Sequence, residues 1–153
     1  MRIHHIRNAT MLLESGRRRI LIDPMLAAKG AMPSFRLLAS GGEPNPTVGL
    51  PEGAMALLDS ATEVIVSHEH LDHLDPPAVA WIIEQDLTVW ASEVDAPSFR
   101  AKGLRVNTLE SGDWDIAVEV IPARHGPGVM GWLMGPVAGF YIAIDGEPGF
   151  YWT

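Results

Sequence analysis

The stretch VSHEHLDHL, residues 66–74, holds three of the chain's six histidines and two acidic residues. It continues the apolar run Val64-Ile65-Val66, which predicts a buried strand that ends near Ser67. In layered α/β proteins, the ends of such strands open into the crevice where ligands bind. Three imidazoles and a carboxylate at this point therefore predict a metal site at the edge of a sheet.

The spacing within this stretch suits two ions. His68 and His70 are two residues apart, so in an extended chain their side chains point to the same side. Asp72 and His73 follow after a turn of the backbone and can face a second ion. Nitrogen-rich ligand sets favour zinc, manganese or iron over calcium and magnesium, which prefer oxygen. Each ion needs three or more protein ligands, and His125, at the end of a predicted strand, is the candidate to complete the first set.

Outward from this stretch, the chain predicts strands first and then strands that alternate with helices, which is typical of a sheet covered by helices. The first three strands are joined by tight turns and predict an antiparallel meander. Residues 25–52 are expected to form a long loop that selects the substrate. The expected strands cover residues 3–7, 10–14, 19–22, 63–67, 87–91, 104–109, 116–121, 139–144 and 150–152, and the expected helices residues 51–59, 76–85 and 92–102.

Composition limits the other functions. The chain has 153 residues, of which 47% are hydrophobic, so one domain with a real core is expected. No apolar run reaches the roughly 18 to 20 residues of a spanning helix, so no membrane partner is predicted. The net charge of -8 argues against nucleic acid as a partner. The absence of cysteine excludes disulfides and thiolate ligands and favours a cytoplasmic location.

HEHLDH at residues 68–73 resembles the H-x-H-x-D-H signature of the metallo-β-lactamase-fold hydrolases. NATMLLESGRRRILIDP at 8–24 is similar to the opening hairpin and first acidic motif of that superfamily, and RHG at 124–126 to its third histidine motif. The nearest branch is that of the ascorbate-6-phosphate lactonase-like proteins. The resemblance implies an α/β fold of mixed β-sheets with covering helices, namely the N-terminal half to two-thirds of the αβ/βα sandwich.

This resemblance also implies a site with two metal ions. Zinc is the expected metal, with manganese or iron as alternatives. The first ion would be held by His68, His70 and His125, and the second by Asp72 and His73. Their task would be to lower the pKa of bound water so that hydroxide is available at neutral pH.

The implied activity is that of a hydrolase that uses a metal-bound hydroxide on a small ester, lactone or phosphoester. Asp72 is the expected catalytic residue, since it would orient the hydroxide and pass a proton to the leaving group. Asp23 is expected to steady the signature by hydrogen bonds and not to bind metal. Trp81, Trp90, Trp114 and Trp152 suit core positions, whereas Trp132 is a candidate for the pocket lining.

The family pattern is not complete in this sequence. It continues to a bridging aspartate after a Gly and to a last histidine, neither of which occurs before Thr153, and Asp145 comes one strand too early. Asn8 stands where related sequences often have a histidine. We therefore expect residues 1–153 to be one domain truncated at its C-terminus. Two alternatives remain open: a non-catalytic metal-binding module, or a fragment that assembles with a complementary C-terminal piece or with a second copy.

Overall fold

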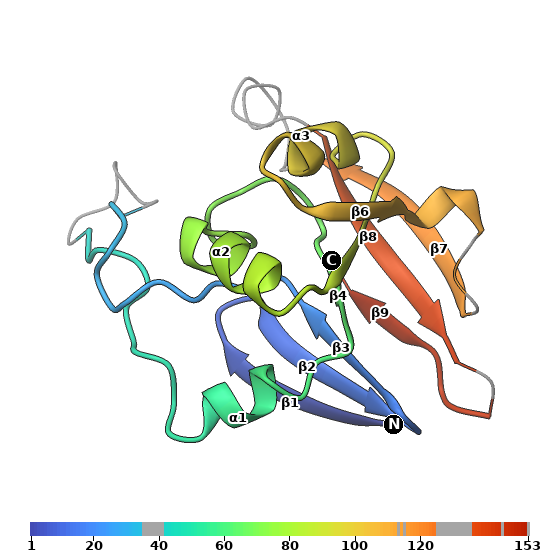
Figure 1. Cartoon of the computed structure of the whole chain (residues 1–153), viewed down its shortest axis with the longest axis horizontal. Coiled ribbons are helices and arrows are strands. Elements are labelled where there is room, and N and C mark those ends of the chain that lie inside the picture. The colour runs from blue at the N-terminus through green and yellow to red at the C-terminus, as the bar shows by residue number, and fades with distance from the viewer. Residues whose placement is uncertain (35–41, 113, 115, 125–135, 145, 153) are drawn as a thin grey trace.

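The structure, a computed structural model, describes residues 1–34, 42–112, 114, 116–124, 136–144 and 146–152. In these residues the strands form two sheets, in the orders β1-β2-β3-β4-β5-β6 and β7-β8-β9 (Figure 1). The strands of the first sheet are β1 (Arg2–Arg7), β2 (Thr10–Ser15), β3 (Arg18–Ile22), β4 (Glu63–Ile65), β5 (Thr88–Ala91) and β6 (Arg105–Thr108). Those of the second are β7 (Ala117–Arg124), β8 (Pro136–Ala143) and β9 (Phe150–Trp152).

The first sheet is mixed. β1, β2 and β3 form the antiparallel meander that the sequence predicts, and from β3 to β6 each neighbouring pair is parallel. Parallel neighbours need crossover connections, and these contain the helices α1 (Ala54–Leu58), α2 (Pro76–Glu84) and α3 (Ala96–Ala101). The carboxyl ends of β3, β4 and β5 therefore meet at one edge, where the connections to the helices begin.

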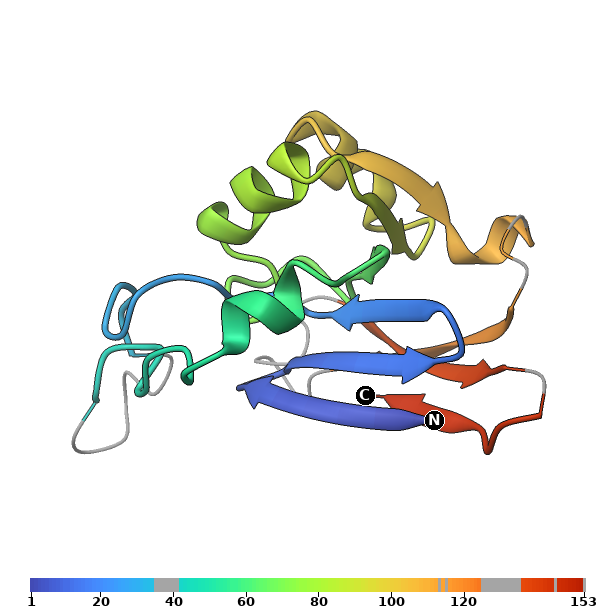
Figure 2. The same ribbon diagram turned by 60° about the horizontal axis from the view of Figure 1, so that its bottom comes forward.

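Two apolar cores lie on opposite faces of the first sheet, because neighbouring strand residues point to opposite sides. Leu12, Leu21 and Val64 pack with α1, α2 and α3 on one face. Leu13 and Ile65 pack against the second sheet on the other face. The molecule thus has three layers, with the second sheet on the side of the first sheet away from the helices (Figure 2). These observations confirm the expected α/β class with mixed sheets and covering helices.

α2 begins at a well-defined residue. The Oδ1 atom of Asp75 accepts the N–H of Ala78 at 2.8 Å, and Pro76 and Pro77 occupy the first helical positions, where no N–H is needed. The other carboxylate oxygen of Asp75 accepts the N–H of Ala27 at 2.7 Å. Asp75 therefore fixes both the start of α2 and the position of the long loop that follows β3.

Arg7 holds the same loop from the side of β1. Its side chain is buried, with 2% exposed, and its guanidinium donates to the carbonyl oxygens of Met25, Ala27 and Val48 at 2.5, 2.8 and 3.1 Å. Both ends of the 25–52 loop are thus tied to the first sheet. Residues 35–41 of this loop lie outside the described residues.

All the predicted elements occur, and the three helices have shorter bounds than expected. α3 begins at Ala96 and not at Ser92, because the Ser92 hydroxyl donates to the Asp95 carboxylate at 2.8 Å and accepts the Asp95 N–H at 3.2 Å, which makes a turn. α1 likewise begins three residues after Pro51, at Ala54. No helix in the described part of the chain is long and apolar enough to cross a membrane.

Candidate metal centre

The signature segment, residues 67–75, connects β4 to α2 at the carboxyl edge of the first sheet. Before it, the N–H of Val66 still bonds to the Trp90 carbonyl at 3.0 Å. Asp23 follows β3 in the same way, and its N–H bonds to the Ile65 carbonyl at 3.0 Å. Because β3 and β4 are parallel neighbours, Asp23 and Ser67 leave the sheet side by side.

The backbone of the signature segment turns on itself. The N–H of His70 bonds to the His68 carbonyl at 3.0 Å, and the His70 carbonyl accepts the N–H groups of His73 and Leu74 at 3.0 and 2.8 Å. The side chains of His68 and His70 converge, as expected, but the expected reason is wrong, since a turn and not an extended chain brings them together.

The three histidines of the segment form one cluster. The Nε2 atom of His68 lies 3.1 Å from the Nδ1 atom of His70, and their ring centroids are 4.5 Å apart. The ring centroids of His68 and His73 are 4.0 Å apart. The segment therefore presents imidazole nitrogens of three side chains within a few ångströms of one another.

Asp23 is the centre of the hydrogen bonds beneath this cluster. Its carboxylate is fully buried, and Oδ1 accepts the backbone N–H of Ser67 at 2.7 Å. The second oxygen, Oδ2, accepts the Ser67 hydroxyl at 2.8 Å, His73 Nδ1 at 2.9 Å and the indole N–H of Trp152 at 2.8 Å. The three contacts with Ser67 and His73 confirm the expectation that Asp23 steadies the signature by hydrogen bonds.

These contacts assign the ring hydrogens of two histidines. A carboxylate only accepts hydrogen bonds, so His73 carries a hydrogen on Nδ1. Ser67 donates its one hydroxyl hydrogen to Asp23, so its oxygen can only accept from His68 Nδ1, which lies 3.0 Å away. His68 therefore carries a hydrogen on Nδ1. In their neutral forms, His68 and His73 therefore both carry their lone pair on Nε2, the nitrogen that faces away from Asp23 and Ser67.

Asp72 lies on the outer side of His73. The Oδ2 atom of Asp72 is 3.9 Å from Nε2 of His73, and the Asp72 side chain is 37% exposed. Burial alone lowers the pKa of His73, but the hydrogen bond and charge of Asp23 and the charge of Asp72 outweigh it, so the pKa of His73 is raised above its ordinary value. The two carboxylates thus face opposite ring nitrogens of His73.

The other flank of the segment is held by the region of α3. Lys102 donates to the Glu69 carboxylate at 2.5 Å, and this hydrogen bond is the main reason why the pKa of Glu69 lies below its ordinary value. Asp95 accepts the backbone N–H of Glu69. Burial raises the pKa of Asp95, against the opposing effects of the hydrogen bonds from Ser92 and Glu69. Glu69 is therefore directed away from the histidine cluster and toward α3.

The distance between the facing ring nitrogens of His68 and His70 suits two ligands of one metal ion. Two nitrogens about 2.1 Å from one ion with tetrahedral geometry are roughly 3.4 Å apart, close to the 3.1 Å between His68 Nε2 and His70 Nδ1. Among the described residues, no group of three or more His, Asp or Glu side chains forms a finished site. His125, expected as a third ligand, lies outside the described residues, as do Trp132 and Asp145.

Three contributors to this centre were not predicted. Ser67 precedes the signature, and its hydroxyl contacts both His68 and His73 at 3.0 and 3.1 Å. Asp95, directly before α3, accepts the N–H of Glu69, and Trp152 of β9 donates to Asp23. Only Ser67 carried a local signal, as a small hydroxyl residue at a strand end, whereas the other two are distant in sequence.

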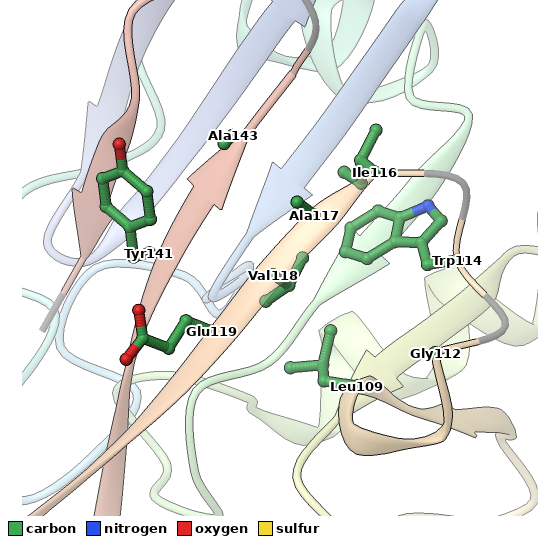
Figure 3. A pocket seen from close by; sticks show the side chains of 9 residues that line it. All are labelled: Leu109, Gly112, Trp114, Ile116, Ala117, Val118, Glu119, Tyr141 and Ala143. Carbon is green, nitrogen blue, oxygen red and sulfur yellow. The ribbon is translucent and has the colours of Figure 1, made fainter.

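A separate hollow of about 680 Å³ opens beside β7. In Figure 3, Leu109, Ile116 and Val118 lie around the indole of Trp114, and Glu119 and Tyr141 lie farther from it, beyond Val118. None of its nine lining residues belongs to the signature segment, and Asp23 is not among them. This hollow therefore has no part in the candidate metal centre.

The chain is similar to known proteins in its family, its sequence and its structure. A family model described as the β-lactamase superfamily domain matches residues 18–153. The UPF0173 protein YddR of Bacillus subtilis is 33% identical over 155 residues, a match that covers 99% of this chain and 61% of that protein. The chain thus spans about three-fifths of this relative's length.

Two solved structures are similar over nearly the whole chain. A possible metal-dependent hydrolase from Veillonella parvula superposes with a TM-score of 0.87, and an isothiocyanate hydrolase from Delia radicum gut bacteria with a TM-score of 0.78. Both are 29% identical in sequence, and each match covers 99% of this chain and 61% of the other.

Proposed function

The chain belongs to the β-lactamase superfamily, and from this premise we propose that it carries the metal-binding part of a metal-dependent hydrolase. The observation that carries the proposal is the ordered histidine cluster. His68 Nε2 and His70 Nδ1 lie 3.1 Å apart, and the Nδ1–H of His73 is held by the buried carboxylate of Asp23 at 2.9 Å. A histidine that donates one ring N–H to a carboxylate is the usual arrangement of a metal ligand.

We assign the ligands as the sequence indicates. His68 and His70 hold the first ion, with His125 as their third partner. His73, through Nε2, and Asp72 hold the second ion. Zinc is the first candidate, and manganese or iron are the alternatives, since all three accept this mixture of nitrogen and oxygen ligands.

The metal ions would supply a water of lowered pKa and polarise the bond to be cleaved. The residues of this chain then have separate tasks. Asp72, partly exposed, is placed to orient the attacking water and to pass a proton to the leaving group. Asp23 and Ser67 keep the lone pairs of His68 and His73 on the outward nitrogens.

The substrate is a small molecule with an electrophilic centre: an ester, a lactone or a phosphoester. The structural relative from Delia radicum gut bacteria is an isothiocyanate hydrolase, so we add isothiocyanates, with their electrophilic carbon, to the candidate substrates. The 25–52 loop, held by Arg7 and Asp75, is the element that we propose to select among them.

Metal content tests the ligand assignment. The chain is loaded with zinc, desalted and measured by elemental analysis, beside the variants His70→Ala and His5→Ala. His5 is a matched control, because it is exposed on β1 and its Nε2 contacts the Asn8 carbonyl at 2.8 Å, outside the cluster. We expect about one tightly held equivalent in the wild type and in His5→Ala, and a loss of that equivalent in His70→Ala.

Equal zinc content in the wild type and His70→Ala would overturn the assignment. Nearly two tightly held equivalents would contradict the expectation that the first site, with three proposed ligands, binds zinc more strongly than the second site, with two. Turnover of lactone, phosphodiester and isothiocyanate substrates is then measured on the loaded protein. Zinc binding without turnover of any of them would favour the non-catalytic metal-binding module.

A further inference from the structure

Trp152 links the second sheet to the metal centre. It lies on β9, and its indole N–H donates to the Oδ2 atom of Asp23 at 2.8 Å, although the two residues are 129 positions apart. Asp23 follows β3 in the first sheet, so this hydrogen bond joins the two sheets directly beneath the histidine cluster.

The position of the indole ring is fixed by its own sheet. Trp152 is paired with Phe140 on β8, and Phe140 is fully buried between the sheets. The ring of Phe150 is nearly parallel to that of Trp152, with 12° between their planes and 6.4 Å between their centroids. Trp152 itself packs against the apolar core between the sheets. Its N–H therefore points at Asp23 from a rigid support.

The three side chains that donate to Oδ2 of Asp23 differ in how freely their N–H or O–H can change direction. The Ser67 hydroxyl can rotate, and the ring of His73 belongs to a loop, whereas an indole has one donor in a fixed direction and no acceptor. All three donate to the same oxygen, Oδ2. The indole is thus the donor that sets the orientation of the carboxylate, to which the other two adjust.

We propose that Trp152 is a positioning residue of the metal centre: its indole N–H orients the Asp23 carboxylate, which in turn keeps the hydrogen of His73 on Nδ1 and the lone pair on Nε2. The inference rests on the proposed function, because only a metal ligand needs Nε2 of His73 in this form. It assigns the second sheet a part in metal binding in addition to its part in the core.

The test compares Trp152→Phe with Trp114→Phe in the full chain. Trp114 is a matched control, because its indole N–H also donates to a carboxylate at 2.8 Å, that of Glu63, and no histidine is involved. The first measurement is a long-range ¹H–¹⁵N NMR spectrum of the metal-free protein, which reports the ring hydrogen of His73. The second is a stepwise zinc titration by competition with a chelator.

With Trp152→Phe, we expect His73 to lose its preference for hydrogen on Nδ1 and the weaker zinc site to lose about tenfold in affinity, as is usual when a partner of a metal ligand is removed. With Trp114→Phe, we expect both measurements to match the wild type. If Trp152→Phe does not fold, β-(3-benzothienyl)alanine at position 152, which has sulfur in place of the N–H, tests the same hydrogen bond with the ring shape retained.

An unchanged His73 spectrum and unchanged zinc affinity in the position-152 variant would overturn the inference and leave the proposed function intact. If the wild type binds no zinc, the proposed function fails, and the NMR comparison still decides whether the indole orients Asp23. Equal changes in both tryptophan variants would show a general effect on packing and would also overturn the positioning role.

Discussion

Asp23 combines two properties that are uncommon in one residue. Its backbone has a positive φ of 47°, which Asp and Asn tolerate better than other residues with a side chain, and its carboxylate is fully buried. The backbone is held on both sides, because its carbonyl accepts the Thr10 hydroxyl at 2.8 Å and its N–H bonds to Ile65. A buried charge is stable only with enough donors, and Asp23 has four.

Arg7 gives a prediction at the same scale. Replacement by Met removes the donors to three carbonyl oxygens, those of Met25, Ala27 and Val48, of which the first two contacts are buried. A buried carbonyl left without a partner costs about 1 to 3 kcal/mol. We therefore expect Arg7→Met to lower the free energy of unfolding by about 3 kcal/mol, measured by urea denaturation, and to make the 25–52 loop more sensitive to protease.

Arg105→Met is the control for this change. Arg105 is 55% exposed and pairs with Asp86 at the surface, so its loss is expected to cost less than about 1 kcal/mol. Similar losses in the two arginine variants would contradict the view that burial of the loop contacts makes Arg7 important.

At the scale of the element, β2 is the strand on which the meander depends. Glu14 in β2 is paired with Arg2 on β1 and with Arg19 on β3, and His4 lies 3.2 Å from its carboxylate. The hydrogen bond with His4, followed by the charges of His4, Arg19 and Arg2, lowers the pKa of Glu14 against the effect of burial. Cross-strand pairs of opposite charge stabilise a sheet in this way.

The pH dependence of stability follows from the sign of this shift. Because the pKa of Glu14 is lower in the folded state than in the unfolded chain, ionised Glu14 stabilises the fold above its ordinary pKa of about 4.5, and this contribution is lost as the pH falls through the folded pKa. We expect Glu14→Gln to be less stable than the wild type at pH 7, with a difference that shrinks below about pH 4.5.

Thermal unfolding of both proteins between pH 7 and pH 3 measures this difference. Glu119→Gln is a matched control, since Glu119 is exposed on β7 and has no ion pair among the described residues. A difference that persists at low pH would show that Glu14 acts through packing and not through its charge.

At the scale of the whole molecule, the second sheet depends on one face of β8. Phe140 and Tyr141 are neighbours on this strand, but Phe140 is fully buried against the first sheet and Tyr141 is 40% exposed on the other side. We expect Phe140→Ala to lower the free energy of unfolding by about 3 to 5 kcal/mol and Tyr141→Ala by roughly 1 kcal/mol or less, as measured by urea denaturation. Equal losses would mean that the two sheets are not packed as one core.

Much of this arrangement could be predicted because its signals are local. Alternating apolar residues predict the strands, the two prolines at 76–77 predict the start of α2, and the ligand types in the signature segment predict its chemistry. The late start of α3 could not be predicted in the same way, because Ser92 and Asp95 compete for the backbone through their own hydrogen bonds.

The sequence by itself determined the order of the elements, the location of the signature segment and the residues that we propose as its metal ligands. Only the tertiary structure decided how these residues are oriented. His68 and His70 meet through a turn, and the ring hydrogens of His68 and His73 depend on Ser67 and Asp23. The hydrogen bond between Trp152 and Asp23 joins two sheets that pack face to face. Such contacts depend on how separate strands are placed in space, and no spacing along the chain encodes that placement.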